Sequence, residues 1–210
     1  MKIEVYQDTV CPWCRIGKRN LILALKQWQA EPVEVTYRSF FLNPNIPAEG
    51  FPFHEYMHAK GGGQVPLEDF FDAPRRMGAQ VGLNFAFERI ERAPNSLLSH
   101  RLIYLAPAEK KEAILDAVYA AYFEFGQDIG DLEVLLGIAG EHGLDVDQLR
   151  QQLADDAGRE EVLVEARRAR LFGVSGVPYF IVDDRYAFSG AQPPEAIVDI
   201  LNQITEKQHA

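Results

Sequence analysis

Hydrophobic and polar residues alternate near both ends of the chain, as they do in β-strands. Ile3, Val5 and Val10 mark a short run that predicts a first strand, and residues 33–37 predict a second. Residues 178–188 contain two apolar runs separated by a pair of aspartates, which predicts a hairpin. Strands are therefore expected at the beginning and at the end of the sequence.

In the rest of the chain, apolar residues recur at the spacing that is typical of α-helices. It begins in residues 12–28, where Pro12 suits the first helical position because its missing N–H would be unpaired there anyway. Further helices are expected in the middle of the chain, with Asp131 as one cap and Asp145 opening a capping-box pattern. Residues 193–204 predict a final helix. The expected order is βαβ, a series of helices, and ββα.

Proline and glycine become frequent between residues 43 and 63, which indicates a loop or a domain border. Within this stretch His54, Glu55 and His58 match the H-E-x-x-H pattern of zinc proteases. Pro52 and Gly61 leave little room for the long helix that such a zinc site needs. We therefore expect a surface helical turn near the site entrance, and no metal site.

Composition narrows the range of functions. The chain has 210 residues, 47% of them hydrophobic, so it can bury a full core without disulfides. Its formal net charge of -10 opposes phosphate binding, so we expect no nucleic-acid partner. No apolar run reaches the roughly 18 residues of a membrane span, and the first residues do not resemble a secretory signal. These features predict a cytoplasmic protein with no membrane partner.

The candidate chemistry lies in Cys11-Pro12-Trp13-Cys14, which contains both cysteines of the chain. In a reducing compartment such a pair is more typical of catalysis or metal binding than of structure. A helix that starts at Pro12 places Cys11 at its N-terminus, where free N–H groups and the macrodipole stabilise a thiolate. Because the thiolate attacks disulfides, Cys11 is the predicted nucleophile. Cys14, one turn later, is expected to resolve the mixed disulfide.

A second motif precedes the predicted hairpin. Residues 173–178 read Gly-Val-Ser-Gly-Val-Pro and end before an apolar strand. A cis bond before Pro178 would leave the backbone of Val177 free to pair with a substrate chain. We expect Val177 and Pro178, together with Pro12 and Trp13, to position the substrate.

Taken together, the two motifs resemble the DsbA-like thioredoxin superfamily, and within it the cytosolic FrnE-like branch. The resemblance also includes Ile16-Gly17-Lys18 and Ser189-Gly190-Ala191-Gln192. It implies an α/β fold in which a thioredoxin-like domain, residues 1–44 and 172–210, is interrupted by a large all-helical insertion domain, residues 45–171. It further implies that Pro178 is the cis-proline, that Cys11 attacks and that Cys14 resolves.

The chain departs from its relatives in two ways. Periplasmic members carry signal peptides, which the first residues of this sequence do not resemble. An oxidase role in secretion is therefore not expected. Some FrnE-like proteins have an additional cysteine pair towards the C-terminus, whereas this chain has two cysteines in all. A second redox centre is therefore not expected.

Other interpretations of the same residues remain open. One alternative for Cys11 and Cys14 is half of a zinc site, but zinc needs four ligands and there is no second cysteine pair. Asn95 and His100 lie at the start of a predicted helix, where an Asn has a structural explanation as a cap. Resemblance to hydroxychromene-carboxylate isomerase and kappa-type glutathione transferases instead makes Asn95 and His100 candidate contacts for a substrate or glutathione.

The sequence therefore predicts a thiol–disulfide oxidoreductase that exchanges or isomerises disulfides of protein or small-molecule thiols. No metal or organic cofactor is expected beyond the redox-active disulfide, with glutathione as a candidate co-substrate. One alternative is a glutathione-dependent isomerase or transferase related to hydroxychromene-carboxylate isomerase. Another is a non-enzymatic module that binds unfolded chains. The direction of exchange, whether oxidation, reduction or isomerisation, is left open.

Overall fold

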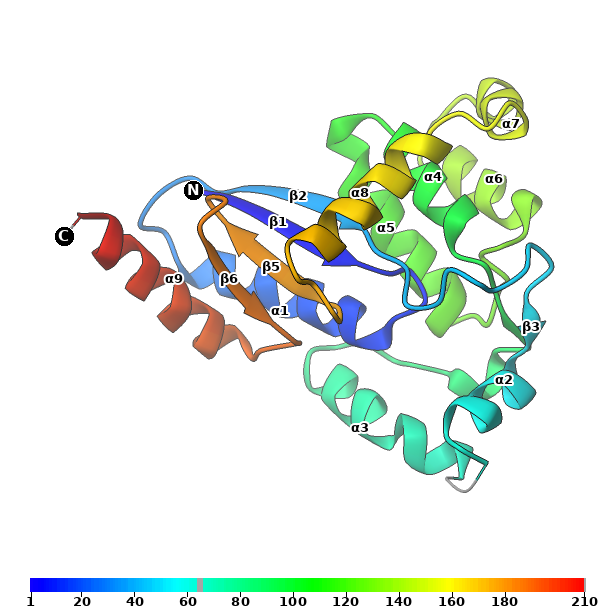
Figure 1. Ribbon diagram of the computed structural model, residues 1–210, viewed down its shortest axis with the longest axis horizontal. Coiled ribbons are helices and arrows are strands. Elements are labelled where there is room, and N and C mark those ends of the chain that lie inside the picture. Colours follow the sequence, from blue (N-terminus) through cyan, green and yellow to red (C-terminus); the bar gives the residue numbers. More distant parts are fainter. Residues whose placement is uncertain (64–65, 210) are drawn as a thin grey trace.

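Strands from both ends of the chain form one four-stranded sheet (Figure 1). The first strand, β1, lies inside the sheet, parallel to β2 and antiparallel to β5. The edge strand β6 is antiparallel to β5. The order across the sheet is β2 (Glu34–Ser39), β1 (Lys2–Gln7), β5 (Tyr179–Val182) and β6 (Tyr186–Ser189).

Helices make up most of the rest of this computed structural model, which describes residues 1–63 and 66–209. Between β3 (Phe51–Pro52) and β4 (Arg92–Ala93) there is a short antiparallel ladder, and a 3-10 turn covers Phe87–Arg89. The α-helices are α1 (Pro12–Gln27), α2 (Phe53–Lys60), α3 (Leu67–Gln80), α4 (Leu97–Leu105), α5 (Ala108–Phe123), α6 (Leu132–Glu141), α7 (Val146–Ala154), α8 (Arg159–Leu171) and α9 (Pro194–His209).

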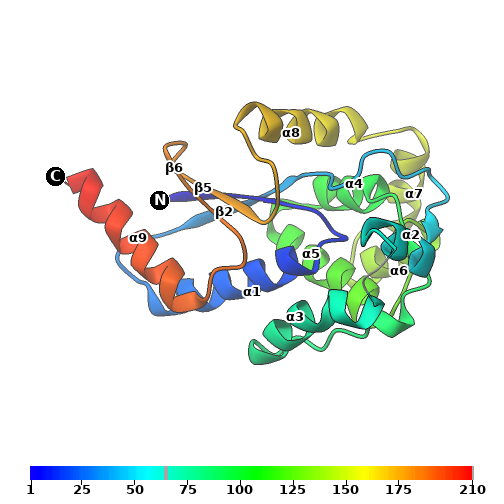
Figure 2. The ribbon, with the colours of Figure 1, turned by 60° about the horizontal axis from the view of Figure 1, so that its bottom comes forward.

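Each face of the sheet is covered by helices (Figure 2). Ile3 and Val5 of β1 point to the face that α1 and α9 cover, and Phe180 of β5 joins them in that core. Tyr6 and Ile181, one position along, point to the opposite face, where they pack with residues of α8 and the loop after it. The alternation follows from the two-residue period of a strand, which sends successive side chains to opposite faces.

The other end of the molecule is formed by α2 to α7 (Figure 1). Helices α4, α5, α6 and α7 pack on one another, and α3 packs against α1 and α2. One hydrophobic cluster runs from these helices to the start of α1 and includes Cys11, Cys14 and Ile16. The start of α1 is therefore anchored in the core of the helical part and lies at its junction with the sheet.

The predicted fold class is confirmed: the chain has a thioredoxin-like sheet with helices inserted between its βαβ and ββα parts. The caps at Asp131 and Asp145 are confirmed as well, because each side chain accepts backbone N–H bonds from the first turn of its helix. The hairpin turns at Asp183 and Asp184, both with positive φ. No helix among the described residues has the length and apolar content needed to cross a membrane.

Some element boundaries differ from the prediction. The first strand ends at Gln7 rather than near Val10, because the N–H of Cys11 bonds to the carbonyl of Asp8 and closes a turn. The stretch 43–63 is not only a loop, since it contains β3 and the eight residues of α2. Helix α8, at the end of the range 45–171, packs against both β2 of the sheet and α4.

Candidate active site

The dithiol lies at the first turn of α1. Cys11 is the residue that precedes the helix, in an extended conformation, and Pro12 occupies the first turn. The first turn contains no acidic side chain, and no side chain caps it. Cys11 therefore lies at the positive end of the helix macrodipole, and the first turn contains no carboxylate that would compete with a thiolate for this position.

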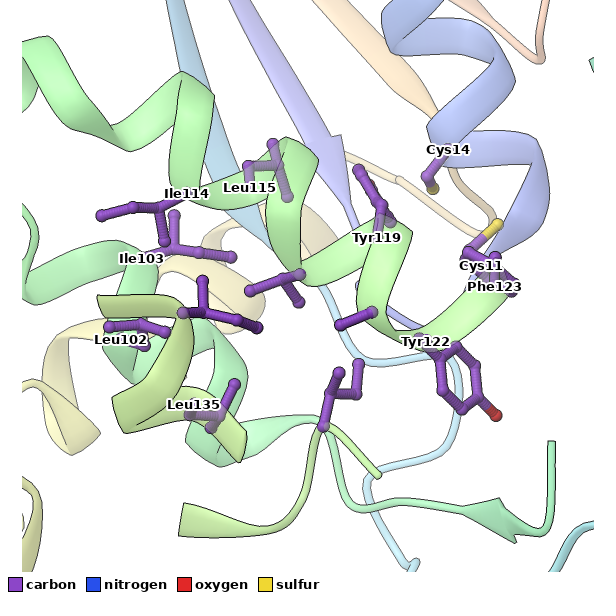
Figure 3. Packing of buried hydrophobic residues seen from close by; sticks show 14 of the residues in the cluster. Cys11, Cys14, Leu102, Ile103, Ile114, Leu115, Tyr119, Tyr122, Phe123 and Leu135 are labelled. Atoms are coloured by element: carbon purple, nitrogen blue, oxygen red, sulfur yellow. The ribbon is translucent and has the colours of Figure 1, made fainter. Parts of the chain in front are cut away.

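Both cysteines are free thiols and both are buried: Cys11 is 3% exposed and Cys14 is 1% exposed. Figure 3 shows them at the start of α1, beside Tyr119 and Phe123 of α5. Burial is the main cause that raises the pKa of Cys14 well above its ordinary value, and the neighbouring Cys11 raises it further. Cys14 is therefore held as a neutral thiol behind Cys11.

The loop before β5 brings the second motif to the dithiol. The peptide bond between Val177 and Pro178 is cis, as the resemblance implies. The carbonyl oxygen of Val177 accepts a hydrogen bond of 3.6 Å from the Cys11 thiol. Further along α1, a Cβ at Gly17 would lie 2.7 Å from Cγ of Pro178, so this glycine allows α1 and the loop to approach each other closely.

A cavity of about 280 Å³ opens beside the dithiol. Cys11, Pro12 and Trp13 contribute to one side of it, together with Val177. Residues of α2 and α3 contribute to another side, so α2 lies beside the candidate site. Apart from these four residues, the lining consists of Asp8, Val10, Leu42, Asn43, Ile46, Phe53, Tyr56, Met57, Lys60, Phe70, Phe71, Pro74, Phe87, Ala93, Pro94, Ser96, Tyr122, Phe123 and Gly176.

Asp8 is a buried carboxylate of this site that the sequence analysis did not single out. It is 1% exposed and lines the cavity. Its Oδ2 accepts a bond of 2.8 Å from the N–H of Leu42, and its Oδ1 lies 3.4 Å from Nε2 of His100. The available signal was an acidic residue directly after a buried strand and three positions before Cys11.

Asn95 and His100, the candidate substrate contacts, lie before and within α4. Oδ1 of Asn95 accepts the N–H of Leu97 at the start of α4, and its Nδ2 donates to a backbone carbonyl. His100 is 1% exposed, with its ring edge-on to Phe41. Neither residue belongs to the described lining of the cavity. The structure therefore brings together Cys11, Cys14 and the Val177–Pro178 loop, and places Asn95 and His100 outside that group.

Two buried cations lie on the helix that carries the dithiol. Arg15 donates to the backbone carbonyl of Asp116 at 3.0 Å and pairs with Glu124. Lys18, 2% exposed, pairs with Asp116 at 2.8 Å and with Glu112 at 3.3 Å. Both charges are thus bound by α5 and the residue that follows it, and they attach this helix to α1.

The H-E-x-x-H segment forms the exposed side of α2. His54, Glu55 and His58 are all exposed. Across residues 1–63 and 66–209, no group of three or more His, Cys, Asp or Glu side chains is arranged to hold a metal ion. The segment serves the site through its other residues, since Tyr56 and Met57 line the cavity.

Residues 2–202 match the family model of the DSBA-like thioredoxin domain. The chain is also similar to the probable DsbA oxidoreductase SCO1869 from Streptomyces coelicolor. The two are 34% identical, with a TM-score of 0.89 over 97% of this chain and 89% of the other. Both similarities extend over nearly the whole chain.

Two more distant solved structures share the fold. One is 2-hydroxychromene-2-carboxylate isomerase, 16% identical, with a TM-score of 0.72 over 100% of this chain and 98% of the other. The other is the cytosolic disulfide reductase DsbM from Pseudomonas aeruginosa with GSH, 17% identical, with a TM-score of 0.68 over 98% and 100% of the respective chains. At these identities the likeness shows a common fold.

Proposed function

Because the chain belongs to the DSBA-like thioredoxin domain family, we propose that it is a thiol–disulfide oxidoreductase whose reaction takes place at Cys11 and Cys14. The observation that carries this proposal is the reduced dithiol at the start of α1, with the Cys11 thiol 3.6 Å from the carbonyl oxygen of Val177. Disulfide exchange requires a nucleophilic thiolate, which a helix N-terminus stabilises, and here a backbone carbonyl lies beside that nucleophile.

The reaction proceeds in two exchanges. The thiolate of Cys11 attacks one sulfur of a substrate disulfide, forming a mixed disulfide and releasing the other sulfur as a thiolate. Cys14 then loses its proton and attacks the Cys11 sulfur, which releases the second substrate thiolate and closes the Cys11–Cys14 disulfide. Two electrons pass from the dithiol to the substrate, and the reverse sequence oxidises a substrate dithiol. This chemistry needs no metal or organic cofactor.

The two cysteines are suited to different steps because their surroundings differ. Cys11 lines the cavity, where a substrate sulfur can reach it. Burial raises the pKa of Cys14, so this residue stays protonated until the mixed disulfide has formed. Pro12, Trp13 and Val177 line the cavity around Cys11 and position the substrate.

The substrates are protein or small-molecule thiols and disulfides, and the reaction is proposed to take place in the cytoplasm. Glutathione is included as a candidate co-substrate because DsbM, which has the same fold, was solved with GSH. A glutathione-dependent isomerase would need no second thiol. The buried Cys14 behind Cys11 therefore favours disulfide exchange.

Trapping of the mixed disulfide tests the proposal. The variant Cys14→Ser should accumulate a covalent adduct on Cys11 when incubated with glutathione disulfide or a cysteine-containing peptide disulfide, visible as a mass increase that dithiothreitol removes. Cys11→Ser, the matched control, should form no such adduct while folded, because Cys14 is buried and, unlike Cys11, is not among the described residues that line the cavity. Absence of an adduct on Cys14→Ser with every disulfide tested would contradict the proposal.

A further inference from the structure

The cavity beside Cys11 is lined mainly by aromatic and aliphatic side chains. Phe53, Phe71 and Phe87 form a continuous stack in which the ring centroids are 5.6 Å and then 4.2 Å apart. Phe123 packs edge-on against Phe87 at 5.9 Å. These rings come from α2, α3, the 3-10 turn and α5, so four elements distant in the sequence form one apolar wall.

Few charged groups reach this cavity. Among the described lining residues only Asp8 and Lys60 carry a charge. Asp8 is 1% exposed and already accepts hydrogen bonds from the backbone of Leu42 and Val10. Lys60 lies at the exposed end of α2, with its amine 6.0 Å from the ring centre of Tyr56. Among the described lining residues, these two charges therefore lie outside the aromatic wall, and the wall itself offers no cation to a carboxylate.

The volume limits the size of the group that fits. An apolar cavity of about 150 Å³ binds a single benzene ring, whereas this cavity measures about 280 Å³. It therefore has room for one aromatic ring with a short alkyl chain, or for two fused rings. Because Cys11 lines the same cavity, a group held there must be joined by a short link to the substrate sulfur that Cys11 attacks.

We propose that the substrates of this site are small-molecule disulfides and thiols whose sulfur carries an uncharged aromatic group, and that the cavity holds this group while Cys11 exchanges with the sulfur. The inference rests on the proposed disulfide exchange and adds a substrate class to it. Against the aromatic wall glutathione is disfavoured, because its carboxylates and ammonium would lose water there without gaining charged partners.

The exchange is balanced by the dithiol itself. Attack of the Cys11 thiolate on an aryl-bearing disulfide breaks the substrate S–S bond, forms the Cys11–substrate bond and releases one thiolate. Attack by Cys14 releases the second, so that one substrate disulfide yields two thiols and the protein gains one disulfide. Repeated turnover needs an external dithiol, such as dithiothreitol, to reduce the Cys11–Cys14 disulfide.

Single-turnover rates of the reduced protein test the selectivity. Three alkyl disulfides are compared: bis(2-phenylethyl) disulfide, the uncharged non-aromatic bis(2-hydroxyethyl) disulfide, and glutathione disulfide. Each rate is divided by the rate of the same disulfide with dithiothreitol, which removes intrinsic reactivity. We expect the phenylethyl compound to be preferred over the hydroxyethyl compound about 30-fold, or ~2 kcal/mol at 1.4 kcal/mol per tenfold, as burial of one aromatic group predicts.

Variants of the wall assign the preference to the cavity. Phe70→Ser removes a ring that lines the cavity and is 39% exposed, and Ala93→Leu fills space from a buried position. Both should lower the phenylethyl preference at least about 5-fold, in line with the loss of part of an aromatic contact. Phe125→Ser, at a 61% exposed ring outside this lining, is the matched control and should keep the preference of the unaltered protein.

The outcomes separate the two proposals. Equal normalised rates for all three disulfides would overturn the aromatic selectivity and leave the exchange reaction standing. A phenylethyl preference that Phe70→Ser and Ala93→Leu both retain would also overturn the selectivity, because the cavity would not be its cause. Failure of all three disulfides to oxidise Cys11 and Cys14 would overturn the proposed function itself.

Discussion

Cys11 and Val177 are 166 residues apart in the sequence, yet the thiol of the first lies 3.6 Å from the carbonyl oxygen of the second. The sheet accounts for this contact. β5 pairs antiparallel with β1, with Tyr179 opposite Tyr6, so the loop before β5 lies beside the loop that follows β1. The site consequently exists only when the two ends of the chain have paired.

Gly17 should be required for the fit between α1 and this loop. A methyl group at this position would lie 2.7 Å from the ring of Pro178 and 3.5 Å from the ring of Phe180. We expect Gly17→Ala to lower the free energy of unfolding by about 1–3 kcal/mol through overpacking, measured by urea denaturation. It should also slow disulfide exchange, because Pro178 has to move.

Gly137 provides the matched control for that substitution. It lies within α6, is exposed, and has nothing within 4 Å of an added methyl group. Gly137→Ala should raise the free energy of unfolding by about 0.5–1 kcal/mol, the helix preference of alanine over glycine, with no change in exchange rate. A similar gain in stability from Gly17→Ala would contradict the close packing against Pro178.

The reactivity of Cys14 should depend on pH in the direction that burial dictates. Burial raises its pKa, so the thiol form persists in the folded protein where a free cysteine, with a pKa of about 8.5, already ionises. In the Cys11→Ser variant, iodoacetamide should therefore modify Cys14 rapidly at pH 8.5 only after unfolding. Mass spectrometry with and without guanidinium gives the comparison.

The same shift has a consequence for stability. The stabilisation linked to the Cys14 proton is complete below the unfolded pKa, and it is lost as the pH rises towards the folded pKa. In the reduced protein it should therefore decline above pH 8.5 or so. Cys14→Ala should lack this component of the alkaline loss. In the alkylation experiment, rapid modification of folded Cys14 at neutral pH would contradict the argument that burial holds it as a thiol.

The elements that position the dithiol could be predicted because local signals define them. Alternating residues define β1 and β2, Pro12 opens α1, and Asp183 with Asp184 marks the hairpin. α3 gave a weaker signal, since it contains Pro74, which removes a backbone donor from the helix interior. The position of α8 against β2 depends on tertiary packing, which periodicity alone does not report.

The candidate site was predictable where its residues lie in motifs and not where packing assembles it. Both cysteines and the Val177–Pro178 pair stand in short patterns with a physical reason. The carboxylate of Asp8 gains its place from contacts with Leu42 and His100, which are 34 and 92 residues away. The cavity likewise depends on rings from separate elements, and no single segment of the sequence predicts it.

Asp8 should be essential for the structure around the site. Its carboxylate accepts bonds from the N–H groups of Leu42 and Val10 and contacts His100. We expect Asp8→Ala to cost about 2–4 kcal/mol of unfolding free energy, because three partners lose their acceptor at once, two of them in part-buried hydrogen bonds and the third the buried His100. Asp8→Asn keeps one acceptor oxygen and should cost about 1–2 kcal/mol. Equal losses for both variants in urea denaturation would show that these hydrogen bonds are not the cause.

Lys18 should contribute more to the stability of the fold through its buried stem than through its charge. The residue is 2% exposed, its amine lies 5.4 Å from the ring centre of Tyr37, and its carboxylate partners Glu112 and Asp116 are about half exposed. Lys18→Met keeps the stem, and the carboxylates it releases can return to water, so we expect a change within about 1 kcal/mol.

Removing a partner of Lys18 has the opposite consequence, because it leaves the cation buried with less compensation. Asp116→Asn should therefore lower the free energy of unfolding by about 1–2 kcal/mol, less than for a fully buried pair because water screens Asp116 and Glu112 remains. In the double variant the ammonium is absent, so the loss from Asp116→Asn should nearly vanish in the Lys18→Met background. Urea denaturation of the two single variants and the double variant measures this coupling. Additive losses would mean that the amine and the carboxylate do not stabilise each other.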